Sequence, residues 1–294
     1  MYLPACRRRI GGTPERTLQW QVLVMIPVTV ALLAIVACTA VGRVEGPPVP
    51  RVRADSLRRA DFRRERLAAY RDSFEVVTRD PGSDRDRLVG WRRASMAAHP
   101  GGFLYGEEEG TEAGKTKALD VVLDSALEVR AARSAGRFFG KTEASNIAYE
   151  NGRARGAAEA RLPPEVPVGG GERLRVPVDT ILPAGAFDAL ALLALVPLLD
   201  WQPEAAYLLP VFDAAESSIT YQVLRIGAPE WIDVPAGRYH VYPAELTTTG
   251  RPVRLWVTTA VPHRIVRIDV EADRTRMMLA ASSPPLFQPA EKGR

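Results

Sequence analysis

From residue 72 to residue 281 the chain is a succession of short runs rich in β-branched and aromatic residues, each bounded by turn-forming residues. The run "SFEVVTRD" ends at "PGSD", and the dipeptide Asn151-Gly152 lies between two later runs. Runs of this kind with turn signals between them are typical of antiparallel strands joined by hairpins. The pattern predicts a mainly β domain over residues 72–294, in which consecutive strands form a meander.

One apolar segment interrupts this pattern. Residues 185–199, "GAFDALALLALVPLL", are apolar on every side, and the segment is too short to span a bilayer comfortably. We expect a buried helix that Pro197 ends or kinks, because proline lacks the N–H that a helix interior needs. Asp188 is expected to stabilise the N-terminus of this helix, and the alternative is a buried acid that faces a groove.

The N-terminal residues have the features of an export signal. Three arginines at residues 7–9 precede an apolar run over residues 22–38, and Pro27 divides that run. A basic region followed by a short apolar core fits a secretory signal peptide better than a membrane span, which needs about 20 residues.

The apolar run ends in "IVAC", residues 35–38, which resembles the lipobox of bacterial lipoprotein signal peptides. In that family the cysteine, here Cys38, becomes the lipidated N-terminus. Two alternatives remain open, namely an uncleaved N-terminal transmembrane helix and a plain signal that is cut after Ala40. All three predict export from the cytoplasm to the cell envelope or beyond.

Three regions are therefore predicted. Residues 1–37 form a signal peptide of lipoprotein type, residues 38–71 a tether with a weak helix, and residues 72–294 the β-rich domain. The tether is indicated by prolines in residues 43–54, because proline-rich chain is stiff and extended. The weak helix is expected to begin at Asp55 or Ser56, which are good N-cap residues.

Cysteine usage and charge exclude some classes of function for the body of the chain. The two cysteines, Cys6 and Cys38, both lie in the N-terminal segment, so the body has no disulfide framework and no cysteine nucleophile. Beyond residue 37 the chain has 35 basic and 34 acidic side chains. A nearly neutral body gives no indication of nucleic-acid binding.

The residues that usually carry catalysis show no familiar spacing. The three histidines, His99, His240 and His263, are far apart in the sequence and are expected to have surface or structural roles. The acids of "GEEEGTE", residues 106–112, are expected to form a solvated loop rather than a metal site. We therefore expect no cofactor, no metal and no assignable catalytic residue.

The C-terminal part of the chain resembles a known family in outline. "VPAGRYHVYPAEL" and "RPVRLWVTTAVPHRIVRIDV" have an Ala-Gly before an aromatic strand, a strand that ends near a Trp, a Pro turn and a Val-Arg strand. These features resemble a family of exported bacterial proteins of unknown function that is distantly similar to the Lol carriers of lipoprotein sorting. The residues that carry this resemblance are Ala236, Gly237, Tyr239, Trp256, Pro262, Val266 and Arg267.

The resemblance implies a curved antiparallel sheet, an open half-barrel, with helical segments over its concave side. Such a fold would have an apolar groove suited to acyl chains. The ligand-binding residues predicted on this basis are Leu192, Leu195, Tyr239 and Trp256.

The expected function is that of a cell-envelope lipoprotein, held at the membrane by lipid on Cys38. Its domain is expected to bind an apolar or lipid-like ligand or to act as an interaction module, with no nucleic-acid partner. The alternatives are a structural envelope component with a filled core and, third, a hydrolase.

Overall fold

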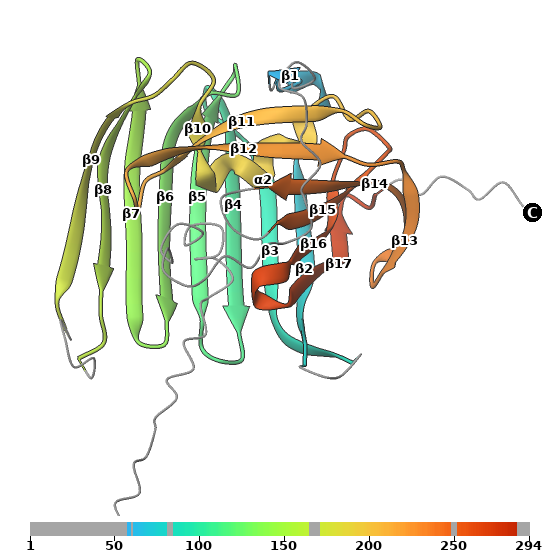
Figure 1. Ribbon diagram of the computed structural model, residues 1–294, viewed down its shortest axis with the longest axis horizontal. Coiled ribbons are helices and arrows are strands. Elements are labelled where there is room, and N and C mark those ends of the chain that lie inside the picture. Colours follow the sequence, from blue (N-terminus) through green and yellow to red (C-terminus); the bar gives the residue numbers. More distant parts are fainter. Residues whose placement is uncertain (1–57, 60, 81–84, 165–170, 248–251, 287–294) are drawn as a thin grey trace, which may run out of the picture.

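A computed structural model describes residues 58–59, 61–80, 85–164, 171–247 and 252–286 (Figure 1). The predicted signal peptide, Cys38 and the predicted N-cap residues Asp55 and Ser56 lie outside these ranges. Within them, no helix has the length and apolar character required to cross a membrane.

The described residues form one sheet of 17 strands, which confirms the mainly β prediction. Eight strands make a first meander: β2 (Tyr70–Arg79), β3 (Asp86–His99), β4 (Gly102–Thr111), β5 (Thr116–Asp124), β6 (Val129–Phe138), β7 (Lys141–Glu150), β8 (Arg153–Arg161) and β9 (Arg173–Ile181). Seven make a second: β11 (Ala206–Asp213), β12 (Ser218–Ile226), β13 (Glu230–Val234), β14 (Gly237–Thr247), β15 (Val253–Thr258), β16 (Ile265–Val270) and β17 (Thr275–Ser283). The short strands β1 (Arg58–Arg59) and β10 (Phe187–Asp188) pair in parallel with β11.

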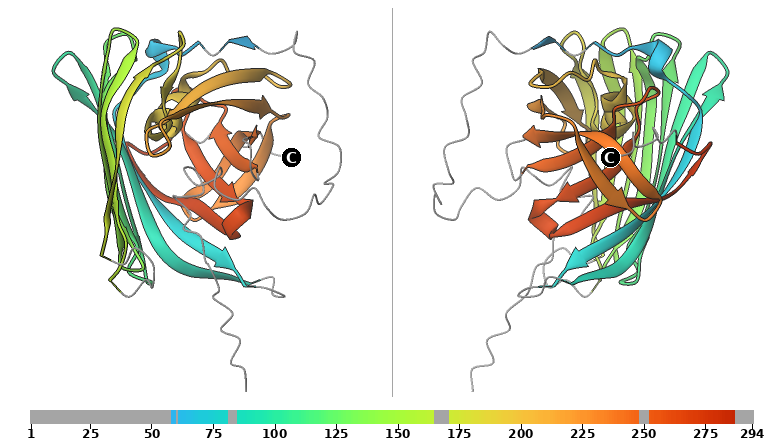
Figure 2. Two further views of the ribbon diagram at one scale, coloured as in Figure 1. Left: turned by 60° about the vertical axis from the view of Figure 1, so that its left-hand side comes forward. Right: turned by 90° about the vertical axis from the view of Figure 1, so that its right-hand side faces the viewer.

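The two meanders are joined along one seam, where β17 pairs antiparallel with β2. The strand order runs from β1 and β10 through β11–β17 to β2–β9, and β9 is not paired with the opposite end of that order. The sheet is therefore curved but not closed, with β11–β17 lying over the concave side of β2–β9 (Figure 2). Among the described strands, β9 pairs only with β8 and forms an edge of the sheet, and Pro177 within it has no N–H to offer a further strand.

The apolar segment is helical and buried, as predicted. It consists of η3 (Ala189–Ala191), the four-residue helix α2 (Leu192–Leu195) and η4 (Val196–Leu198). The α-helical part is short because Pro197 cannot donate to the carbonyl group four residues before it. The segment contacts β5 and β6 and belongs to the central hydrophobic core.

In the described part of residues 55–71, where a weak helix was predicted, the structure has a single 3-10 turn, η2 (Arg64–Arg66). The chain here is otherwise extended and is held by contacts to the apolar segment rather than by its own helical bonds. The Arg63 N–H donates to the Leu198 carbonyl at 2.8 Å, and the Phe62 ring packs edge-on against Phe187. Tertiary contacts therefore override a helical tendency that the apolar spacing supports only weakly.

Candidate functional site

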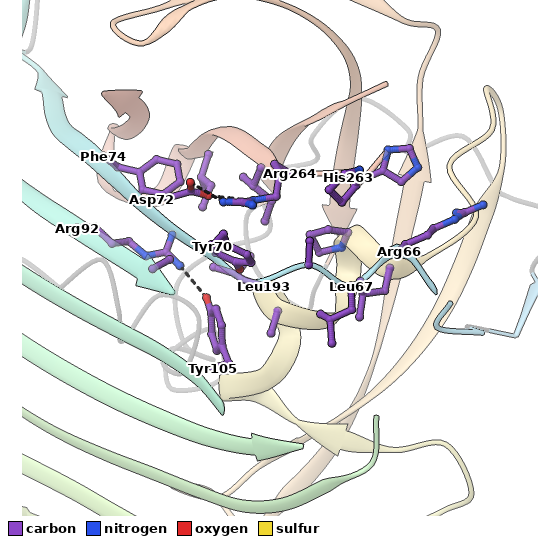
Figure 3. A pocket seen from close by; sticks show the side chains of 18 residues that line it. Arg66, Leu67, Tyr70, Asp72, Phe74, Arg92, Tyr105, Leu193, His263 and Arg264 are labelled. Atoms are coloured by element: carbon purple, nitrogen blue, oxygen red, sulfur yellow. Dashed lines mark hydrogen bonds and ion pairs between the residues drawn. The ribbon is translucent and has the colours of Figure 1, made fainter. Parts of the chain in front are cut away.

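A small pocket lies between the start of the first meander, the apolar segment and the residues before β16 (Figure 3). Its cavity has a volume of about 30 Å³, which holds one or two water molecules and no acyl chain. Both polar and apolar side chains line it, among them Tyr70, Asp72, Phe74, Arg92, Tyr105, Leu193, His263 and Arg264.

The first of two buried ion pairs at this pocket joins Arg264 to Asp72 on β2. Arg264 Nη2 donates to Oδ1 at 2.6 Å and Nε donates to Oδ2 at 3.2 Å. Both side chains are almost fully buried, and the guanidinium lies 3.5 Å from the centroid of the Tyr70 ring. Burial raises the pKa of the Tyr70 hydroxyl, so this ring stays neutral beside the arginine.

The second buried pair joins Arg92 on β3 to Glu107 on β4. Arg92 donates to both carboxylate oxygens, and the Tyr105 hydroxyl donates to the same carboxylate. Burial also raises the pKa of the Tyr105 hydroxyl. The third arginine of the pocket, Arg66, pairs with Asp200 at 2.7 Å. Each arginine at the pocket is therefore already neutralised, and the pocket is not a free anion site.

The acids of residues 106–112 were wrongly predicted to form a solvated loop. They belong to β4 and its turn, and because side chains alternate along a strand, Glu107 and Glu109 share the inward face of Tyr105. Glu109 is buried and accepts from Lys115 Nζ at 2.8 Å, whereas Glu108 is exposed beside Arg93. Over the described residues, no group of three or more His, Cys, Asp or Glu side chains is placed to hold a metal ion.

Lys117 on β5 lies opposite Glu109 in the strand register, on the concave face. Its side chain is half-buried, and no hydrogen bond or ion pair joins it to a described residue. Burial lowers the pKa of its amine, while the nearby charges of Glu107 and Glu109 act in the opposite direction.

The concave face of β4–β9 is covered at one end of the strands and open toward the other. In Figure 1 the lower ends of these strands extend beyond β11, β12 and α2. Tyr105, Val121, Ala132 and Ile147 form one buried row across the strands. Two further rows of paired residues lie below it on the same face. Along these rows the exposed fraction of the side chains is higher at β9, where it reaches 37% at Val176 and 46% at Leu174.

We call these two lower rows the lower concave face. The registers place in it Lys117, Leu119, Ser134, Gly136, Glu143, Ser145, Ala158, Ala160, Leu174 and Val176. Its middle consists mostly of small side chains, and Ser134 and Ser145 hydrogen-bond to each other at 2.8 Å. Among the described residues its charged side chains on β5–β9 are Lys117 and Glu143, of which Glu143 pairs with Lys141 at 2.5 Å, and on β4 the same two rows continue into Glu107 and Glu109.

Besides the two ion pairs, a buried carboxylate, that of Asp188, lies at the start of the apolar segment. Asp188 is the N-cap of η3, as predicted, and its carboxylate accepts from the Leu190 N–H at 2.7 Å and from the Tyr149 hydroxyl. Burial raises the pKa of Asp188 to about 6, and burial raises the pKa of Asp213, on β11, to about 7. Asp188 does not line the pocket of Figure 3.

The histidines contact backbone or threonine groups. His263 lines the pocket, donates from Nδ1 to the Thr258 carbonyl at 2.7 Å, and has its pKa lowered by burial. His240 contacts Thr259 Oγ1 at 3.1 Å, and His99 is exposed. In the part of the chain that the structure describes, no imidazole is joined to a carboxylate.

The four predicted ligand-binding residues do not line the pocket. Leu192 and Leu195 are each 1% exposed inside the core, and the pocket's helical wall is formed by Leu193 and Ala194 instead. Tyr239 donates to the Ala236 carbonyl at 3.2 Å, and Trp256 Nε1 donates to Glu230 at 2.8 Å. Among the described residues, no ring contact or hydrogen bond joins the four, and their role in binding stays a prediction.

Sequence analysis did not single out Arg92, Lys117 or Arg264. A period of two along "FLYGEEEGT" would have placed Tyr105, Glu107 and Glu109 on one face, and the same period along "TKALDVVLD" aligns Lys117 with Leu119. These local signals show which residues share a face. Which charged residues lie next to each other depends on the registers of β3, β4 and β5, which the sequence does not show.

Comparison with known proteins adds a family. Residues 129–279, just over half of the chain, match the family described as a protein of unknown function (DUF3108). None of the curated proteins matches the chain. Among solved structures, the chain is similar to a β-barrel-like protein of domain of unknown function DUF1849 from Brucella abortus, with 10% identity and a TM-score of 0.45, over 76% of this chain and 98% of that one.

Proposed function

The chain belongs to the DUF3108 family of proteins of unknown function, and we propose that it is an exported envelope protein whose lower concave face binds a lipid-like ligand. Export and anchoring by lipid on Cys38 are supported by the signal-like residues 22–38 and the "IVAC" ending. Lipid on a cysteine would hold the protein at a membrane, where lipid-like ligands are abundant.

The observation that carries the binding role is the exposure of apolar side chains on the inner face of the sheet. Val176 and Leu174 are 37% and 46% exposed although they share a face with the buried Val178. Their register partners on β8 are the small residues Ala158 and Ala160. Exposed apolar patches of this kind in soluble domains commonly mark binding sites.

A second candidate function is a structural envelope component with a filled core. The cavity of about 30 Å³ and the 1% exposure of Leu192 and Leu195 favour it, because the upper part of the sheet interior is packed. The two candidates differ in what occupies the lower concave face.

Photocrosslinking in bacteria separates them. Cells that produce the full chain are fed a photoreactive fatty acid with an alkyne tag, and labelled peptides are identified by mass spectrometry. Binding predicts label that depends on irradiation in peptides of β6–β9. Its absence there would favour the structural component.

The same experiment tests the anchor. Label that forms without irradiation is expected at Cys38 in the wild type and is expected to be lost in Cys38→Ala. Equal labelling of both proteins without irradiation would overturn the lipidated anchor and leave the binding result unaffected.

A further inference from the structure

We propose that Lys117 is the head-group residue of this site, and that the ligand of the lower concave face is a long-chain carboxylic acid. The inference rests on the proposed function, since it names the ligand class of the same face.

The charged groups of β3–β5 leave Lys117 without a direct partner. Arg92 donates to Glu107, and Lys115 donates to Glu109, so both acids are already engaged. These two acids and two bases, together with Lys117, form a cluster of two anions and three cations. Among the described residues, Lys117 has neither an ion pair nor a hydrogen bond.

Asp188 is a further acid within electrostatic range of Lys117. Its carboxylate accepts from the Leu190 N–H and the Tyr149 hydroxyl, and no ion pair links it to Lys117. A half-buried ammonium without a direct counter-ion is costly, because burial disfavours the charged form. An anion that reaches Lys117 would remove this cost.

Lys117 also stands at one end of the lower concave face. In the strand register it is followed by Gly136 on β6, Glu143 on β7, Ala160 on β8 and Leu174 on β9. Four steps separate β5 from β9, and at about 4.8 Å a step the row is roughly 19 Å long. The face therefore has a cation at one end, mostly small side chains in the middle, where Glu143 is neutralised by Lys141, and exposed apolar side chains at the other end.

This arrangement matches a single-chain amphiphile with one negative charge. A carboxylate would accept from the Lys117 ammonium, and the alkyl chain would lie over the small residues to reach Leu174 and Val176. An uncharged alcohol or ester of the same length would gain the apolar contacts and not the charge-assisted hydrogen bond to the ammonium.

The test compares two photoreactive probes on the full-length protein, a fatty acid and its methyl ester. On the wild type we expect the acid to reach half-maximal labelling of β6–β9 at a concentration about tenfold lower than the ester. Equal concentrations for the two probes would overturn the role of a carboxylate without any substitution.

Two substitutions then test the residue. Lys117→Met is expected to raise the half-maximal concentration of the acid about tenfold and to leave that of the ester unchanged, while Lys117→Arg keeps the preference for the acid. The matched control is Arg93→Met, which removes one positive charge from a side chain that is 66% exposed beside Glu108. It is expected to alter neither value.

The outcomes are distinguishable. If neither probe labels β6–β9 in the wild type, the proposed function fails and the inference fails with it. If both probes label equally well, or if Lys117→Met retains the acid preference, only the inference fails. Lys117→Met is expected to fold, because it removes a half-buried charge that has no ion pair, and its melting temperature provides the check.

Discussion

Arg264 and Asp72 form a bidentate ion pair in the interior, with both side chains less than 5% exposed, and they link the first meander to the second. Asp72 belongs to the seam, since it lies on β2 opposite Ser282 of β17, whereas Arg264 lies outside it and directly precedes β16. The pair therefore holds together strands that are distant in the sequence, in addition to the backbone bonds of the seam.

Removing one partner of this pair is expected to be costly. Asp72→Ala leaves the Arg264 guanidinium buried and uncompensated, and we expect the free energy of unfolding to fall by about 3–5 kcal/mol in denaturant titrations. The control is Glu108→Gln, in an exposed pair, with a loss below about 0.5 kcal/mol. A double change to Asp72→Leu and Arg264→Met is expected to lose less than Asp72→Ala alone. Similar small losses for Asp72→Ala and the control would contradict a buried pair.

The apolar segment is expected to behave as core. Leu192→Ala and Leu195→Ala each remove a side chain that is 1% exposed, so each is expected to lower the free energy of unfolding by about 2–5 kcal/mol. Leu88→Ala is the matched control, because Leu88 is 52% exposed. A melting temperature within a degree of the wild type for either core variant would show that its side chain is not packed.

Stability is expected to fall with rising pH because of Asp213. Its folded-state pKa of about 7 lies above the value of about 3.9 in unfolded chains, so the folded state holds the proton more tightly. The stabilisation is full below about pH 4 and is lost as the pH rises through about 7. Between about pH 5 and pH 8, the loss of unfolding free energy should be larger in the wild type than in Asp213→Asn, on the order of 2 kcal/mol. Equal losses in both proteins would exclude Asp213 as the source.

Gly102 is expected to be intolerant of a side chain for reasons of space. A Cβ at this position would lie 2.0 Å from the Leu123 carbonyl oxygen, which is backbone and cannot move aside. We expect Gly102→Ala to lower the free energy of unfolding by about 1–3 kcal/mol or more. Gly106→Ala, on the same strand, would meet the side-chain oxygens of Ser95 and Asp120 at 3.3 and 3.4 Å and the Leu119 carbonyl oxygen at 3.8 Å, an ordinary van der Waals contact, and should be tolerated. The reverse order of stabilities would show that β4 and β5 are not this close.

The parts of the fold that were predictable from the sequence rest on local signals. Asn151 and Gly152 have φ of 52° and 69°, which a two-residue type I′ turn requires, and they join β7 to β8. Asp188 is an N-cap because its side chain can reach an N–H two residues ahead. Such signals depend on neighbours in the chain and survive in almost any tertiary context.

The site depends on contacts between distant residues and was largely hidden. Arg92 meets Glu107 only because β3 and β4 pair in one register, and Arg264 meets Asp72 across the two meanders. The helix predicted over residues 55–71 is absent from its described part, residues 58–59 and 61–71, for the same reason, since contacts with Phe187 and Leu198 hold this part extended. Polar residues that pair across strands resemble surface residues when only the sequence is considered.

The seam between β2 and β17 has a consequence for how the protein folds. β2 is the first long strand of the chain and β17 the last, so one edge of β2 stays unpaired until the C-terminal strand has emerged. Folds rich in such non-local pairings form slowly, and an open strand edge attracts other chains meanwhile. A chain that ends before Thr275 would keep two open edges, at β2 and β16, and would tend to aggregate. The interval between the arrival of the first and the last strand is therefore the period in which a chaperone would be needed most.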